Sequence, residues 1–242
     1  MPAQRGSWEL LGRLIAEQEA KLEGFAEADV VELRSRGKRL GDIAVIESAA
    51  EAHVGRALRG HEQMFALTEA CGLEEQHSSA AIHVCLAELA ENVLFHSDAP
   101  YGGFAAAQGW SSRSEVEVAI VDRGVGVRSS LTKNPDYADI RHDVDAIEKA
   151  LEPMVTATPN RNTGLGLSLT RFLLRRNGGL LMVRSGKGAV YAGSTESREK
   201  CDSPFPGTIV TLTARTDASL DINGAWDDLY AAGYTPDDDY SA

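Results

Sequence analysis

Residues Glu115–Gly126 read EVEVAIVDRGVG, and the pattern changes within this stretch from a strand to a glycine turn. Val116, Val118 and Ile120 fall on alternate positions and so on one face, which predicts a half-buried strand. The strand is expected to end at Asp122, with glycines at positions 124 and 126. A carboxylate there can accept a hydrogen bond from an exocyclic amine, and glycines permit a ligand to approach closely. Because Asp and Gly are also ordinary turn residues, this motif alone identifies no ligand.

A long helix is predicted before this strand, beginning with Ser78 or Ser79 as N-cap and ending near Ser97. Its apolar residues recur at steps of three and four, as expected for one buried stripe. The residues of this stripe are Ile82, Cys85, Leu86, Leu89 and Val93.

The same helix carries a polar row. Glu88 and Asn92 are four residues apart, so their side chains project from one face, and His96 continues the row. A solvated helix face would explain this row without any chemistry. Alternatively, an Asn oxygen can bind Mg²⁺, and a Glu can orient or deprotonate a water or hydroxyl group.

A second glycine motif, Thr163-Gly-Leu-Gly-Leu-Ser168, precedes a helix predicted to run through Arg176 and to stop at Asn177-Gly178-Gly179. Free backbone amides and the positive end of the helix dipole favour a phosphate at such a terminus. A simple loop into a helix is the alternative interpretation. No GxxxxGK[ST] motif, zinc-type His/Cys spacing or GxSxG motif is present.

The remaining elements follow from composition and periodicity. Residues 7–70 are rich in helix-forming residues and predict mostly helix. A helix is expected at about Val144–Leu151 and a short one at Trp226–Tyr230, followed by disorder. The other predicted strands are Ala105–Trp110, Leu180–Arg184, Ala189–Ala192 and Thr208–Ala214.

Taken together and in this order, the motifs resemble those of the GHKL ATPase superfamily, which includes gyrase-type ATPases and histidine kinases. Glu88–His96 looks like its N-box, Asp122–Gly126 its G1 box and Gly164–Leu167 its G2 box. Pro206–Thr211 looks like its late Gly-Thr strand. The resemblance covers roughly residues 56–215.

The resemblance implies a ligand, Mg-ATP, and a role for each residue. Asn92 would bind the Mg²⁺ that bridges the phosphates, and Glu88 would be the catalytic carboxylate. Asp122 would bind the adenine amino group, helped by Thr208. The other binding residues implied are Gly124, Gly126, Gly164, Leu165, Gly166 and Leu167. Residues 128–163 would form a mobile lid, with Asn160 or Arg161 as a phosphate contact.

The resemblance also implies a fold, the Bergerat fold, an α/β two-layer sandwich with a mixed sheet against helices. The expected organisation is a helical N-terminal extension at 1–55, the ATPase domain at 56–215, and an acidic, partly disordered tail at 216–242.

Several functions remain open within this superfamily. The nearest group is the stand-alone bacterial anti-sigma-type kinases and ATP-binding regulators, which predicts a protein kinase or ATPase in signal transduction. A switch that binds ATP without turnover and holds a protein partner is an alternative. A histidine kinase with a degenerate dimerisation region is another, although neither His53 nor His61 has a phosphoacceptor context. Dimerisation through residues 7–55 also stays open.

Bulk composition restricts the partners and the compartment. A net charge of −12, concentrated after Arg215, argues against a general nucleic-acid binder. Cys71, Cys85 and Cys201 form no CxxC pair, which favours a reducing cytoplasm. Neither a membrane-length apolar run nor a secretory signal is apparent, so no membrane association is expected.

Overall fold

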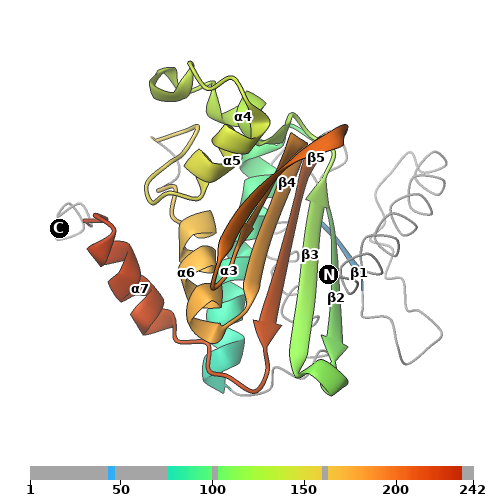
Figure 1. Ribbon diagram of the computed structural model, residues 1–242, viewed down its shortest axis with the longest axis vertical. Helices are drawn as coiled ribbons and strands as arrows, with labels where there is room; N and C mark the ends of the chain where they lie inside the picture. The colour runs from blue at the N-terminus through green and yellow to red at the C-terminus, as the bar shows by residue number, and fades with distance from the viewer. Residues whose placement is uncertain (1–42, 47–75, 100–102, 160–162, 236–242) are drawn as a thin grey trace. The chain divides into compact units, whose positions relative to one another are not determined.

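The computed structural model describes residues 43–46, 76–99, 103–159 and 163–235, and within them the chain forms one five-stranded sheet with helices packed against it (Figure 1). The strands follow the spatial order β1-β2-β3-β5-β4. Their bounds are β1 (Ile43–Ile46), β2 (Gly103–Trp110), β3 (Glu115–Asp122), β4 (Leu180–Ala192) and β5 (Glu196–Arg215). The predicted α/β class is confirmed. A mixed sheet is not seen, because every pairing between the described strands is antiparallel.

The helices of the described chain lie mainly on one side of this sheet. Figure 1 shows α3 and α6 behind the strands, with α4 and α5 at the end where β3 terminates. None of the described helices is both long enough and apolar enough to cross a membrane. Their bounds are α3 (Gln76–His96), α4 (Gly126–Leu131), α5 (Asp143–Ala150), α6 (Gly166–Asn177) and α7 (Ile222–Ala231).

The core forms where the apolar stripe of α3 meets the inward face of the sheet. All five residues of the predicted stripe are buried, none more than 5% exposed. On β3 the predicted alternation is also confirmed, with Val116, Val118 and Ile120 facing the core. Helix α6 adds Leu169, Leu173 and Leu174 to the same cluster. Side chains separated by three or four positions on a helix and by two on a strand therefore form this interface.

The last two strands differ from the sequence-based prediction. The three short strands predicted after residue 179 are two long ones, because β4 and β5 form one hairpin that extends beyond β3. The glycines that suggested a break are accommodated by irregular pairing, with register shifts at Ser185/Gly186 and Gly186/Gly188. Gly186 has a φ of +54°, which glycine adopts readily.

Other element boundaries also need correction. Residues Ile43–Ile46 form a strand paired with β2, although helix was predicted there. The rest of the predicted helical stretch 7–70 lies outside the described residues. Helix α3 already includes Gln76, so neither Ser78 nor Ser79 is its N-cap. Helix α6 stops as predicted at Gly178, which has a left-handed φ of +76°.

Helix α5 belongs to the core rather than to a detached loop. Ala146 and Ile147 are fully buried, and Ile147 joins the cluster that contains Val190 and Ala192 of the hairpin. Asp143, at the start of the helix, accepts hydrogen bonds from Lys187 N on β4 (2.9 Å) and from Arg128 Nε (2.6 Å). Glu148 pairs with Arg198 of β5 at 2.9 Å. The hairpin therefore holds α5 in place along its length.

Candidate nucleotide site

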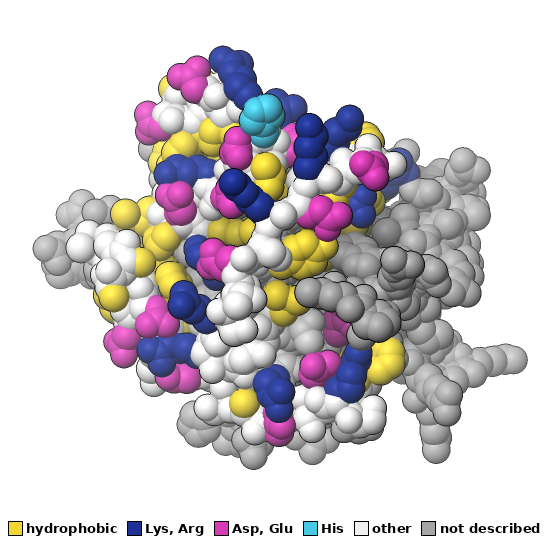
Figure 2. Space-filling view, in the orientation of Figure 1, with side chains coloured by type: hydrophobic (Ala, Val, Ile, Leu, Met, Phe, Trp, Pro, Cys, Tyr) yellow, Lys and Arg dark blue, Asp and Glu magenta, His cyan; other side chains and the backbone are white. Residues whose placement is uncertain are grey.

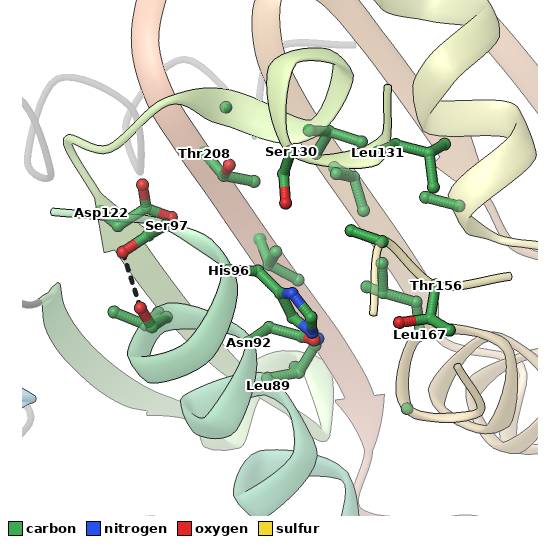
Figure 3. A pocket seen from close by; sticks show the side chains of 18 of the residues that line it. Leu89, Asn92, His96, Ser97, Asp122, Ser130, Leu131, Thr156, Leu167 and Thr208 are labelled. Atoms are coloured by element: carbon green, nitrogen blue, oxygen red, sulfur yellow. Dashed lines mark hydrogen bonds between the residues drawn. The ribbon is translucent and has the colours of Figure 1, made fainter. Parts of the chain in front are cut away.

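A cavity opens where β3 ends, between α3, α4 and the start of α6 (Figure 3). The space in and above it, counting the open solvent at its mouth, is about 850 Å³. Seven of the residues predicted as ligand contacts line it, although they come from four separate parts of the sequence. These residues are Asn92, Asp122, Gly126, Gly164, Gly166, Leu167 and Thr208.

One end of the cavity is formed by Asp122, which is only 5% exposed. Its Oδ1 accepts a hydrogen bond from Gly124 N at 2.8 Å, and Thr208 lies opposite it on β5. Burial raises the pKa of this carboxyl to about 6, although the Gly124 bond and the polar groups of Thr208 both lower it. A buried carboxylate with acceptor capacity left over at one end of an apolar cavity can bind an amine on a flat ligand.

Apolar residues form the walls next to this carboxylate. Ile120, Val183 and Val210 come from three adjacent strands, and Leu89 and Leu131 come from α3 and α4. Such walls can hold an aromatic heterocycle, while the few polar groups fix its orientation.

Gly124 lies outside the cavity lining and serves a different purpose from the one implied. A Cβ on Gly124 would overlap the carbonyl oxygen of Ser97. That oxygen accepts a hydrogen bond from Val125 N at 2.7 Å, so the end of α3 packs directly on the glycine turn. The Ser97 hydroxyl donates to Val93 O at 2.6 Å and accepts from Ala99 N at 3.0 Å, which completes the helix end. Gly124 therefore joins the two motifs, and only a residue without a side chain fits there.

The other end of the cavity is the N-terminus of α6. Gly164 has a φ of +68°, and the helix begins at Gly166 without a side-chain cap. The first amides of a helix have no intrahelical acceptor, so those of Gly166 and Leu167 can donate to an anion in the cavity. Leu165 points elsewhere: it is 6% exposed and belongs to the hydrophobic core.

Glu88 lies beside this helix terminus but does not line the cavity. A Cβ placed on Gly166 would lie 2.8 Å from both the Cβ and Oε2 of Glu88, so the two residues are in close contact. Burial, and secondarily the charge of Glu91, raise the pKa of the Glu88 carboxyl. A raised pKa suits a general base.

Asn92 and His96 project into the cavity from successive turns of α3 (Figure 3). Burial and the nearby Lys133 lower the pKa of His96, while Asp98 opposes this. The ring can therefore be neutral near pH 7, with one donor and one acceptor. In the sequence, His96 continues the polar row and ends the stretch that resembles the N-box, but no ligand role is implied for it.

Within the described residues, no group of three or more His, Cys, Asp or Glu side chains could hold a metal ion. A cation in this cavity would be held by the Asn92 oxygen together with ligand oxygens and water, a set that suits Mg²⁺.

The predicted lid is folded over most of its described length. Helices α4 and α5 lie within it, and moving α5 would expose Ala146 and Ile147. Asn134, after α4, donates to Thr156 O at 3.0 Å and so ties two parts of the segment together. A lid that moves as a whole is therefore not supported. Asn160 and Arg161, the implied phosphate contacts, lie outside the described residues.

Several cavity residues carry no signal in the sequence. Ser130 and Thr156 place hydroxyl groups toward the cavity in Figure 3, and both are buried. They occur in a segment whose sequence matched no motif, so only the fold identifies them.

Surface charge adds little to the description of the site. Figure 2 shows basic and acidic side chains side by side on the face it presents. Several are paired, including Arg128 with Asp143 and Arg198 with Glu148.

Comparison with known proteins leaves the site as the main basis for interpretation. No protein-family model matches the chain, and no curated protein was found to be similar to it.

Proposed function

We propose that this chain binds Mg-ATP in the cavity between β3, α3 and α6, as a GHKL-type domain with the Bergerat fold. One observation carries the proposal: residues from the Asn92 motif, from the two glycine motifs and from Thr208, which are distant in sequence, line one cavity. Chance turn motifs would have no reason to gather around a common space.

The two ends of the cavity match the two ends of the nucleotide. Asp122 and Thr208 would bind the adenine amino group, with the ring between the strand residues Ile120, Val183 and Val210. The amides at the start of α6 would bind the phosphates. Asn92 would contribute an oxygen to Mg²⁺, and the neutral His96 would donate to a phosphate or the ribose.

The use of the ATP is proposed to be phosphoryl transfer to a protein or to water. Glu88 would orient or deprotonate the accepting hydroxyl, because burial has raised its pKa and it touches the α6 terminus. A non-hydrolysing switch is the second candidate. It is favoured by one observation, that Glu88 stands behind the cavity lining rather than in it.

Calorimetric titration of the whole chain with Mg-ATP tests the proposal. The wild type should bind ATP, and Asp122→Asn should weaken binding at least about 100-fold, because the amide presents a donor to the adenine amine. Asp136→Asn is the control, an exposed acid at the short 3-10 turn Pro135–Tyr137 outside the cavity lining. Tight ATP binding by Asp122→Asn would contradict the adenine assignment, and no binding by the wild type would contradict the function.

A further inference from the structure

Ser185 is a buried serine near the middle of β4 that matches none of the motifs. Its side chain is enclosed, with the residue 2% exposed, and it does not line the cavity. The hydroxyl donates to Gly207 O at 2.8 Å and accepts from Val127 N at 2.9 Å. One hydroxyl thus satisfies a backbone acceptor and a backbone donor from two other segments.

These two segments carry the residues at the adenine end of the cavity. Val127 follows Gly126, the last glycine of the turn that begins at Asp122. Gly207 directly precedes Thr208, the residue opposite Asp122. Ser185 therefore contacts both segments immediately beside Asp122 and Thr208, the two residues that would bind the adenine amine.

The backbone at this junction is packed too closely to shift independently. Gly126 has a φ of +78°, and a Cβ there would lie 2.7 Å from Ser185 Oγ. Gly207 has a φ of +107°, and a Cβ there would overlap the carbonyl oxygen of Asp122. Ser185, Gly126 and Gly207 are therefore packed against one another. The Ser185 hydroxyl makes the two hydrogen bonds that join the turn and the strand at this contact.

We propose that Ser185 is a positioning residue for base recognition: its hydroxyl fixes the Asp122 turn against Thr208. The inference rests on the proposed ATP site, and it extends that site to a residue that does not touch the nucleotide. Removing the hydroxyl, as in Ser185→Ala, would leave Val127 N–H and Gly207 C=O without these hydrogen-bond partners. The turn and the strand would then separate, and the donors and the carboxylate would lose their alignment.

Base discrimination is the measurement that separates positioning from general stability. Inosine triphosphate replaces the exocyclic amine with a carbonyl oxygen, so it keeps the phosphates but loses the contact with Asp122. We expect the wild type to prefer ATP. In Ser185→Ala, ATP affinity should fall about tenfold while inosine triphosphate affinity changes less than about twofold, because only the base contact depends on the alignment.

Asn177→Ala provides the matched control. Asn177 is also 2% exposed, and its side chain accepts from Arg215 N at 2.6 Å and donates to Ala218 O at 3.0 Å. It stands at the far end of α6 from the cavity. Its loss should lower the melting temperature as much as Ser185→Ala does, yet leave the ratio of the two affinities unchanged.

Two further variants keep the inference testable if Ser185→Ala folds poorly. Ser185→Cys keeps a side chain of similar shape that forms only weak hydrogen bonds. The ratio of ATP affinity to inosine triphosphate affinity should therefore still fall. Ser185→Thr retains the hydroxyl, and a Thr variant that melts like the wild type should keep the wild-type ratio.

The outcomes distinguish the inference from the function on which it rests. If the wild type binds ATP and prefers it, the proposed site stands. An unchanged ratio in Ser185→Ala or in Ser185→Cys would then overturn the role of Ser185 alone. Failure of the wild type to bind ATP would overturn the site and the inference together.

Discussion

Asp122 and Thr208 lie directly opposite each other on β3 and β5, and the polar groups of Thr208 partly offset the effect of burial on the pKa of the Asp122 carboxyl. The pair ties the end of the first motif to the last strand of the sheet. It also leaves a buried carboxylate with a raised pKa at the cavity. Two effects of pH follow from it, and they have opposite signs.

The first effect is on ligand binding. Because burial raises the pKa of Asp122 to about 6, the acceptor is ionised at neutral pH and protonated in acid. Adenosine affinity should be constant above about pH 7 and fall about tenfold by about pH 5. Adenosine is used because it lacks phosphates that titrate in the same range. Affinity that does not change between these pH values would contradict the assignment of Asp122.

The second effect is on the ligand-free protein. The folded carboxyl holds its proton more tightly than the unfolded one, whose pKa is 3.8, so its contribution to stability falls as pH rises from 3.8 to about 6. The loss is on the order of 3 kcal/mol. Asp122→Asn, which does not titrate, should therefore be at least as stable as the wild type at pH 7 in urea unfolding. A large destabilisation would show that the charge stabilises the fold.

Glu88 decides between an enzyme and a switch. Glu88→Gln should leave ATP affinity within about threefold of the wild type, because the side chain stands behind the cavity lining. If the chain is an enzyme, turnover or phosphotransfer should fall about 100-fold or more. Glu91→Gln is the control, since Glu91 is a partly buried acid on the same helix outside the cavity lining. If neither the wild type nor Glu88→Gln shows turnover or phosphotransfer while both still bind ATP, the result would favour the switch.

Gly124 is predicted to accept no side chain. In Gly124→Ala the new methyl group would collide with Ser97 O, so the end of α3 and the glycine turn must separate. We expect a loss of about 1–3 kcal/mol in unfolding free energy together with weaker ATP binding. Gly124 does not have a left-handed φ, so the loss reports the collision alone. Gly233→Ala is the opposite case, with a φ of +99° and nothing within 4 Å of its Cβ position, and it should leave ATP binding unchanged. A Gly124→Ala variant that binds ATP like the wild type would contradict this packing.

Asp143 is expected to hold α5 against the hairpin. Burial alone would raise its pKa, but the hydrogen bonds from Lys187 N and the Arg128 guanidinium outweigh burial and lower it. Its stabilising effect is therefore present above the unfolded pKa and lost as pH falls through the lower folded value. Asp143→Asn should cost about 1–2 kcal/mol at neutral pH and speed hydrogen exchange of α5.

Asp145 is exposed and follows Asp143 by two residues in α5, so it serves as the control for Asp143→Asn. Asp145→Asn should change neither the urea midpoint nor the exchange of α5. An equal effect of both substitutions would mean that the helix responds to its charge and not to the Asp143 contacts.

The parts of the fold that were predictable are those with a strong period. The α3 stripe and the alternation in β3 were found because each repeats over several turns or residues and faces one core. The helix stop at Gly178 was also found, because only a left-handed residue ends α6 in this way. These signals are local, and a single sequence contains them.

The hairpin and β1 were not predictable for different physical reasons. Gly186 and Gly188 look like strand breakers, yet the pairing shifts around them, and a Cβ on Gly188 would lie 2.6 Å from Val144 N. Their function is close packing on α5, which no local pattern reveals. β1 has only four residues and lies within a stretch of helix-forming composition, so its strand state depends on pairing with β2.

The candidate site divides in the same way. Asn92, Asp122, Gly126, Gly164 and Gly166 line the cavity and could be singled out from the sequence, because each belongs to a motif with its own chemistry. Ser130, Thr156 and Ser185 could not, because a single serine or threonine in a helix, loop or strand has no distinguishing neighbours. Their roles depend on tertiary contacts between segments far apart in the chain.

The strand order has a consequence for how the chain is made. β5 is the last strand in the sequence but lies between β3 and β4 in space. A chain emerging from the ribosome therefore exposes facing edges of β3 and β4 until β5 is released and inserts between them. Asp122 pairs with Thr208 only at that stage. A ligand that binds both residues could therefore stabilise the folded state only after synthesis has passed Arg215. Until then, a ligand that needs both Asp122 and Thr208 could not protect the two strand edges.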